Sequence, residues 1–173
     1  ILEENGAQLI AIHARTKEQG YGGLADWDAI AEVKAAVKIP VIGNGDLMFP
    51  HEVHERMATT GCTAVMSARG ALIKPWLFRE IREGRAFLPT PDERFAILWR
   101  FVELLREHFG IDERGQKRTL RFLPWHLNFF CRYVPLPEDQ YAEQAREHPL
   151  LQSRIQAPPP ASSLEKLLGE HDG

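Results

Sequence analysis

Two short segments of this sequence place glycine and polar side chains directly after apolar runs. Gly43-Asn44-Gly45-Asp46 begins at the last residue of the run Ile39–Gly43, and Ala68-Arg69-Gly70 follows Thr63–Ser67. Glycine lets backbone N–H groups approach an anion closely, and a guanidinium can donate two hydrogen bonds to a phosphate. Together the segments favour a phosphate-binding site. Taken alone, each has a plainer interpretation: a turn in which Asp46 caps the next helix, and a surface arginine at a helix start.

His13 is the last residue of a third apolar run, Ala7–His13, and Arg15 lies just after it. Functional residues of parallel α/β barrels lie at the carboxyl ends of the strands, so both side chains are candidates for the same site. The alternative for His13 is a core histidine that is hydrogen-bonded to a neighbouring carbonyl.

A cluster of cations forms a third candidate site. Lys117, Arg118 and Arg121 share one face of a predicted helix by their i, i+3 and i+4 spacing, and the Trp125, Phe129 and Phe130 side chains of the same helix are predicted to lie in the core. The chain has a net charge of −3, so contact with nucleic acid requires a local patch of this kind. A solvated basic face is the alternative.

The elements that position these residues change in character along the chain. The first half alternates apolar runs with amphipathic stretches, which predicts parallel strands near residues 8–13, 39–43 and 63–67, with helices over 26–37, 50–60 and 75–83. Three strands cannot close a barrel, so further strands are expected upstream of Ile1. The second half predicts helices over 91–109, with Phe95 among its inward residues, over 116–133 and over 138–147.

Composition excludes several classes of protein. Cys62 and Cys131 are far apart without a CxxC pair, so neither a disulfide framework nor a zinc site is expected, and a reducing cytoplasm suits the chain. No metal site is expected elsewhere, and no apolar run approaches the ~18 residues of a membrane span. Because the chain starts at Ile1 and not at Met, we expect it to be part of a longer protein.

The order of these motifs resembles that of the tRNA-dihydrouridine synthases over about residues 5–135. The matching segments are His13-Ala14-Arg15-Thr16, Gly20-Tyr21, Ala25-Asp26-Trp27, Gly43-Asn44-Gly45-Asp46, Ala68-Arg69-Gly70-Ala71, Lys74-Pro75-Trp76-Leu77-Phe78 and Gln116-Lys117-Arg118 with Arg121. Lys74, where bacterial members more often carry asparagine, and Cys131-Arg132-Tyr133 resemble the eukaryotic-type third paralogue class, which acts on a variable-loop uridine.

The resemblance implies an α/β fold: the C-terminal part of a (β/α)8 TIM barrel over residues 1–88, then a small all-α tRNA-binding domain over 89–150, with a Pro-containing linker and tail over 151–173. It implies FMN as cofactor, NADPH as its reductant and tRNA as substrate. The implied FMN site comprises His13, Arg15, Asn44, Gly45, Asp46, Ala68, Arg69 and Gly70, and the implied tRNA contacts are Lys117, Arg118 and Arg121.

In this family hydride passes from the flavin N5 to uridine C6, and a cysteine on a barrel loop protonates C5. That cysteine is expected upstream of Ile1, so no catalytic residue is expected in this chain, which is then inactive alone. Two other functions stay open: a different FMN or sugar-phosphate barrel enzyme, and a non-enzymatic RNA-binding remnant.

Overall fold

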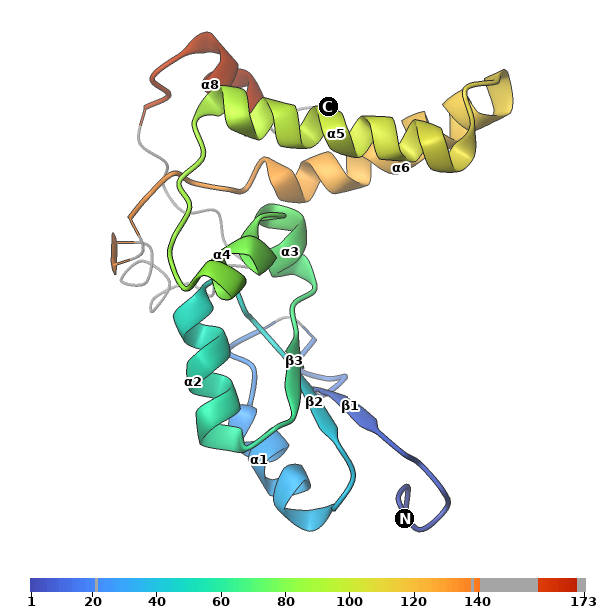
Figure 1. Ribbon diagram of the computed structural model, residues 1–173, viewed down its shortest axis with the longest axis vertical. Coiled ribbons are helices and arrows are strands. Elements are labelled where there is room, and N and C mark those ends of the chain that lie inside the picture. The colour runs from blue at the N-terminus through green and yellow to red at the C-terminus, as the bar shows by residue number, and fades with distance from the viewer. Residues whose placement is uncertain (21, 138, 141–158, 171–173) are drawn as a thin grey trace.

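A computed structural model describes residues 1–20, 22–137, 139–140 and 159–170 of the chain. Its first half holds a parallel sheet with strand order β1-β2-β3, as predicted. The strands are β1 (Ile10–His13), β2 (Val41–Asn44) and β3 (Ala64–Met66). Because the three strands are parallel, their carboxyl ends meet at one edge of the sheet (Figure 1).

Two helices connect the strands, and the sequence predicted both. Helix α1 (Trp27–Ala36) begins after Asp26, whose carboxylate accepts a hydrogen bond from the Ala29 N–H as an N-cap. Helix α2 (Pro50–Thr60) has proline at its first position, where no N–H is needed, and Gly61 in the left-handed region at its end. The two helices pack against each other on the same face of the sheet (Figure 1).

The two faces of the sheet differ. Ile12, Gly43 and Val65 are in register and face the helices, where Ile12 and Val65 pack against the cluster around Trp27. A Cβ at Gly43 would lie 2.5 Å from the Trp27 ring, so only glycine fits there. His13, Asn44 and Met66 form the next row in register and therefore belong to the opposite face, on which His13 and Met66 are exposed.

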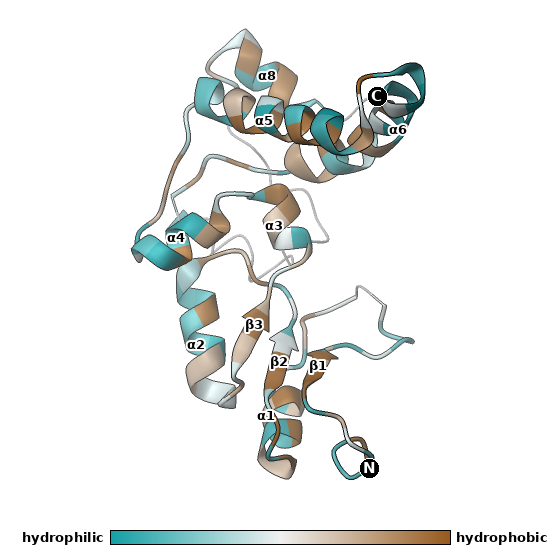
Figure 2. Ribbon diagram, turned by 45° about the vertical axis from the view of Figure 1, so that its right-hand side comes forward, coloured by the Kyte–Doolittle hydropathy of each residue, from teal (hydrophilic) through white to brown (hydrophobic). Residues whose placement is uncertain are grey.

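After β3 the chain forms short helices and then long ones. Helix α4 (Leu77–Glu83) lies within the helix predicted over 75–83, and helix α3 (Arg69–Ile73), which precedes it, was not predicted. Helix α5 (Pro91–Phe109) has the predicted bounds, with Thr90 and Glu93 forming a capping box. Helices α5 and α6 (Glu113–Phe130) form a long hairpin that lies beyond α3 and α4 from the sheet, and α8 (Ser163–Gly169) packs on α5 (Figures 1 and 2).

Some helical expectations were wrong. Helix α6 begins three residues earlier than predicted and ends at Phe130, so Arg132 lies outside it. Trp125 and Phe95 were predicted to face the core, but their exposed fractions are 54% and 43%. The sequence pattern gives the period of a helix but does not identify which of two apolar stripes is covered. The predicted helix over 138–147 lies almost wholly outside the described residues.

The two halves share one hydrophobic core. Phe49 and Trp76 from the first half pack with Phe130, Tyr133 and Leu168 from the second. Trp76 meets the Tyr133 ring edge-on, with 4.8 Å between the centroids. This core fixes the helical hairpin relative to the sheet.

The shared core also contains charges. The Lys74 ammonium lies 2.7 Å from the Glu80 carboxylate, and both side chains are buried. Arg94 is buried as well, and its guanidinium donates to the Phe130 and Leu168 carbonyls near the ends of α6 and α8. Burial lowers the pKa of Arg94 from its ordinary value, because the charged form loses hydration.

Candidate functional site

The loops after all three strands converge on the carboxylate of Asp46. Asp46 lies just beyond β2 with φ of 42°, which is uncommon for a residue other than glycine. Its oxygens accept hydrogen bonds from the Arg15 side chain and from the Ala25 N–H, and the Arg69 guanidinium lies 3.5 Å away. Residues 15, 46 and 69, which the sequence predicted to meet at one edge, do meet there.

Arg15 makes the tightest of these contacts. One terminal nitrogen is 3.1 Å from Asp46 Oδ1, and the other donates to Asp46 Oδ2 and, at 2.7 Å, to the Gly23 carbonyl. Its side chain is only 1% exposed, and its Nε has no hydrogen-bond partner. The pair connects the loops after β1 and β2, and it occupies the Asp46 carboxylate.

Asp46 therefore does not cap α2. The Glu52 carboxylate does so, accepting from the Met48 and Phe49 N–H groups.

Arg69 completes a junction with an excess of positive charge. Arg69 is the first residue of α3, and its side chain is 16% exposed. Its guanidinium lies near Asp46 Oδ1, whereas the closest Arg15 nitrogen donates to Asp46 Oδ2. Two guanidinium groups thus surround one carboxylate, a net charge of +1. An arrangement of this kind has the charge that suits an anion.

Asn44 links β2 to its neighbours on both sides. Its side-chain N–H donates to the Met66 carbonyl at 2.6 Å, and its own carbonyl accepts from the Ala14 N–H at 3.0 Å. Asn44 is buried, whereas His13, in register beside it, is exposed at the same edge. The amide therefore holds the strand ends in place next to an accessible imidazole.

The glycines predicted for this site permit close packing. A Cβ at Gly45 would lie 2.5 Å from the Ala25 Cβ, and a Cβ at Gly70 would overlap the Leu47 carbonyl. Gly70 follows Arg69 in α3, after the N-cap Ala68. The loops after β2 and β3 can therefore touch through backbone only while position 70 has no side chain.

The cations predicted to contact nucleic acid lie elsewhere, on α6. Lys117, Arg118 and Arg121 line a shallow cavity of about 570 Å³ together with Arg114, Glu113 and Asp112. Lys117 forms an ion pair with Glu113 at 2.6 Å. The beginning of α6 is at the end of the hairpin that is remote from the sheet (Figure 1). The site at the strand ends and the basic surface are therefore separate.

Three participants were missed from the sequence. Arg114 precedes Arg118 by one helical turn, and an earlier start for the helix would have included it. The Ala25 N–H and the Gly23 carbonyl contact Asp46 and Arg15 through backbone atoms of the loop before α1. Side-chain type carries no signal for such backbone contacts.

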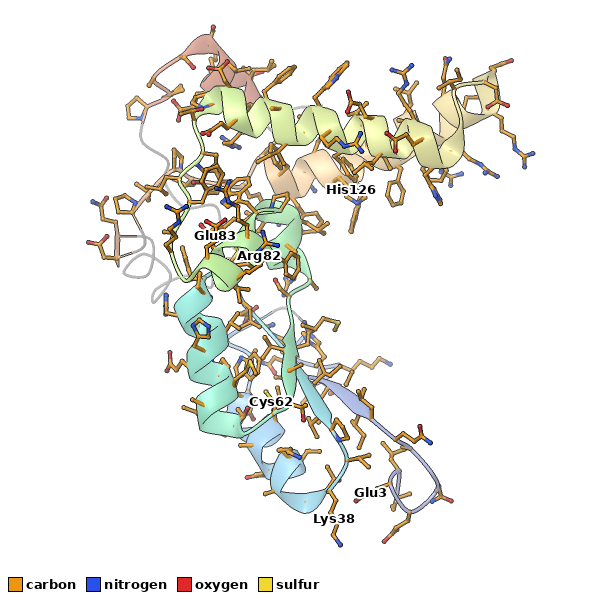
Figure 3. All side chains as sticks on the ribbon, in the orientation of Figure 1. Glu3, Lys38, Cys62, Arg82, Glu83 and His126 are labelled. Carbon is orange, nitrogen blue, oxygen red and sulfur yellow. The ribbon has the colours of Figure 1, made fainter. Side chains whose placement is uncertain are left out.

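The described part of the chain lacks two other kinds of feature. Within those ranges, His, Cys, Asp and Glu side chains do not gather in a group of three or more that could hold a metal ion. None of the described helices is long and apolar enough to cross a membrane. His126 lies between the helices of the hairpin and the first half, away from the strand ends (Figure 3).

Comparison with known proteins identifies a family model and several relatives that match this chain. Residues 1–148 match the family model described as dihydrouridine synthase (Dus). The chain is 46% identical over 136 residues to the Homo sapiens protein named tRNA-dihydrouridine(47) synthase [NAD(P)(+)]-like, with 78% of this chain and 21% of that protein covered. The Oryza sativa protein of the same name is 42% identical over 76% of this chain and 20% of that protein.

A fungal protein of similar name also matches this chain. The Candida albicans tRNA-dihydrouridine(47) synthase [NAD(P)(+)] is 37% identical over 153 residues, which cover 79% of this chain and 25% of that protein. The chain thus spans about a fifth to a quarter of the length of the curated relatives it matches. From the match to its family model, the chain belongs to the dihydrouridine synthase family.

Proposed function

We propose that this chain is part of an enzyme that uses FMN and NADPH to reduce uridine to 5,6-dihydrouridine in tRNA. The observation that carries the proposal is the convergence of Arg15, Asp46 and Arg69 from three successive strand ends. Carboxyl ends of parallel strands are where α/β barrels bind substrates and phosphate groups. Membership of the family supports the class of reaction, and the geometry of the strand ends supports the location of the cofactor site.

The residues at the strand ends fit the phosphate of a flavin nucleotide. The junction has an excess guanidinium charge, and Gly45 and Gly70 keep the loop backbones close enough to surround a small anion. In this proposal Arg69 contacts the phosphate with Ala68 and Gly70, while Asn44 and Gly45 line the pocket. Arg15 and Asp46 position the loops, since each is held by the other.

The rest of the cofactor would lie along the exposed face of the sheet. His13 is exposed at the end of β1, in register with Asn44, and is the side chain we assign to the flavin itself. When bound, the flavin supplies the hydride that reduces the uracil ring. The sheet residues of this chain would orient the ring and keep it against its target base.

The proton for the reduced base has to come from another group. Cys62 precedes β3 at the amino end of the sheet and is buried, and Cys131 follows α6 in the other half. Neither cysteine lies at the strand ends, so neither is assigned as the acid. The proposed donor is a cysteine on a barrel loop outside this chain, and the proposed fold is the C-terminal part of a (β/α)8 barrel with a helical domain.

The substrate in this proposal is a tRNA that contacts the helical hairpin. Lys117, Arg118 and Arg121 form a basic surface on a chain that is acidic overall, which suits local contact with phosphates. The relatives' names carry the position 47, which supports a variable-loop uridine as the target. Both cysteines are unpaired thiols, which agrees with a reducing cytoplasm.

One experiment tests this function in the full-length protein. The purified protein is incubated with unmodified tRNA and NADPH, and nucleosides from the digested RNA are separated by mass. We expect dihydrouridine to appear and to require bound FMN. A sugar-phosphate enzyme would leave the RNA unchanged, and an RNA-binding remnant would bind tRNA without containing flavin or consuming NADPH.

A further inference from the structure

Trp125 is exposed on α6, one helical turn beyond Arg121 at the end of the basic surface. Its side chain is 54% exposed, although tryptophan is usually covered. Arg114, Arg118, Arg121 and Trp125 occupy positions i, i+4, i+7 and i+11 of one helix, so all four side chains share one face. The opposite side of the helix holds the buried residues Gly115, Thr119 and Phe130.

The indole has a fixed orientation. It packs edge-on against Phe129, with 5.1 Å between centroids and 65° between planes, and against His126, at 4.7 Å and 77°. These two ring contacts limit the rotation of the indole. Little side-chain entropy would therefore be lost when a flat group stacks on the indole.

Charge distinguishes this tryptophan from Trp99, which is exposed on the other helix of the hairpin. Helix α6 carries four cations and one carboxylate, a net charge of +3. Trp99 on α5 is 51% exposed and stacks on Phe95, but α5 carries three arginines and four carboxylates, a net charge of −1. Of the two, Trp125 is the one that lies beside an excess of positive charge.

We infer that Trp125 stacks on an unpaired nucleobase of the bound RNA, while Arg114, Arg118 and Arg121 contact the phosphates leading to it. A basic stripe that leads to an exposed aromatic ring suits a single-stranded nucleotide, since phosphates pair with the cations and every base presents a flat face to the ring. The inference rests on the proposed function, because it takes tRNA as the substrate, and it adds a residue that distinguishes loop nucleotides from duplex.

Binding by the full-length protein tests this role, with two RNAs as probes: an unmodified tRNA transcript and a blunt RNA duplex. Trp125→Ala should weaken tRNA binding at least about fivefold, leave duplex binding unchanged and leave the salt dependence unchanged. Trp125→Phe should retain most of the affinity. Trp99→Ala is the matched control and should bind both RNAs as the wild type does.

The cations should behave differently from the ring. Arg118→Ala with Arg121→Ala should weaken binding of both RNAs and lower the slope of log K against log salt by roughly 0.7–0.9 for each phosphate that is no longer neutralised. Trp125→Leu against Trp125→Phe repeats the comparison should the alanine variant fail to fold. Loss of tRNA affinity with leucine but not with phenylalanine supports stacking.

Two results would overturn the inference and are distinguishable. If Trp125→Ala binds tRNA like Trp99→Ala while the double arginine variant is weakened, Trp125 does not stack and the proposed function is unaffected. If the wild-type protein does not bind tRNA at all, the stacking role and the tRNA part of the proposed function fail together.

Discussion

The guanidinium of Arg15 and the carboxylate of Asp46 form a partly buried, two-point contact between the loops after β1 and β2. Each Arg15 terminal nitrogen donates to a different Asp46 oxygen, and 31 positions of sequence separate the partners. Such a planar pair fixes both distance and orientation. The rest of the site depends on it, because Asp46 also meets Arg69 and the Ala25 N–H.

Removing one partner of this pair should be costly. Arg15→Ala leaves Asp46 with only Arg69 and the Ala25 N–H, and we expect a loss of about 1.5–3 kcal/mol in the free energy of unfolding. Arg15→Lys should restore only part of this, since an ammonium cannot make the two-point contact. Urea unfolding of the full-length protein measures both, with Arg79→Ala, an exposed arginine paired with Glu83, as control. Equal stabilities for Arg15→Ala and Arg79→Ala would refute the structural role.

Gly70 should not tolerate a methyl group. A Cβ there would overlap the Leu47 carbonyl, a backbone atom that cannot rotate away, so Gly70→Ala must separate α3 from the loop after β2. We expect about 1–3 kcal/mol of destabilisation and poor flavin retention. Gly169→Ala is the control, because nothing lies within 4 Å of a Cβ at that position. Normal flavin content in a folded Gly70→Ala protein would show that the close approach is dispensable.

Changes to the basic surface of α6 should affect tRNA binding and not flavin reduction. Changing Lys117, Arg118 and Arg121 to alanine should raise the apparent KM for tRNA, and reduce the salt slope by roughly 0.7–0.9 for each phosphate that the surface no longer binds. Flavin reduction by NADPH should stay near normal, because these residues are remote from the strand ends. A control that removes three exposed cations elsewhere is Arg82, Arg85 and Lys166 to alanine. An unchanged slope in the folded α6 variant would mean that its charges are merely solvated.

Tyr133 should make the protein sensitive to alkali. Burial raises the pKa of Tyr133 to about 12, from 10.0. The unfolded chain then loses this proton first, so stability is fully present below pH 10 and is lost as the pH rises toward 12. The loss should reach about 1.4 kcal/mol near pH ~11. Tyr133→Phe should lose less stability between pH ~8 and pH ~11 than the wild type does. Identical losses in the two proteins would contradict the raised pKa.

Local signals were enough to predict most of the elements. Pro50 and Gly61 bound α2, and Thr90, Pro91 and Gly110 bound α5, because caps and proline act within a few residues. The strand ends were recognisable for a similar reason, as polar residues and glycine interrupt apolar runs. Their convergence followed from parallel topology, which the sheet confirms.

Contacts between distant positions were not readable. The sequence does not indicate whether Arg15 binds Asp46 or a cofactor, because a guanidinium can bind a carboxylate as well as a phosphate. The structure shows that it binds Asp46. The exposure of Trp125 was also missed, because its spacing fits an apolar stripe as well as the basic stripe that it joins. The packing of Leu168 into the shared core depends on a helix near the end of the chain that has little signal of its own.

Arg69 provides the most direct test of the whole account, through the FMN content of the purified full-length protein. Arg69→Ala should weaken FMN retention by about 1.5–3 kcal/mol, the range of a charge-assisted hydrogen bond, while Arg79→Ala keeps the wild-type flavin content. The account predicts flavin absorbance in the wild type and in Arg79→Ala, and its loss on dialysis of Arg69→Ala. Flavin retained equally by all three proteins would contradict a phosphate site at these strand ends.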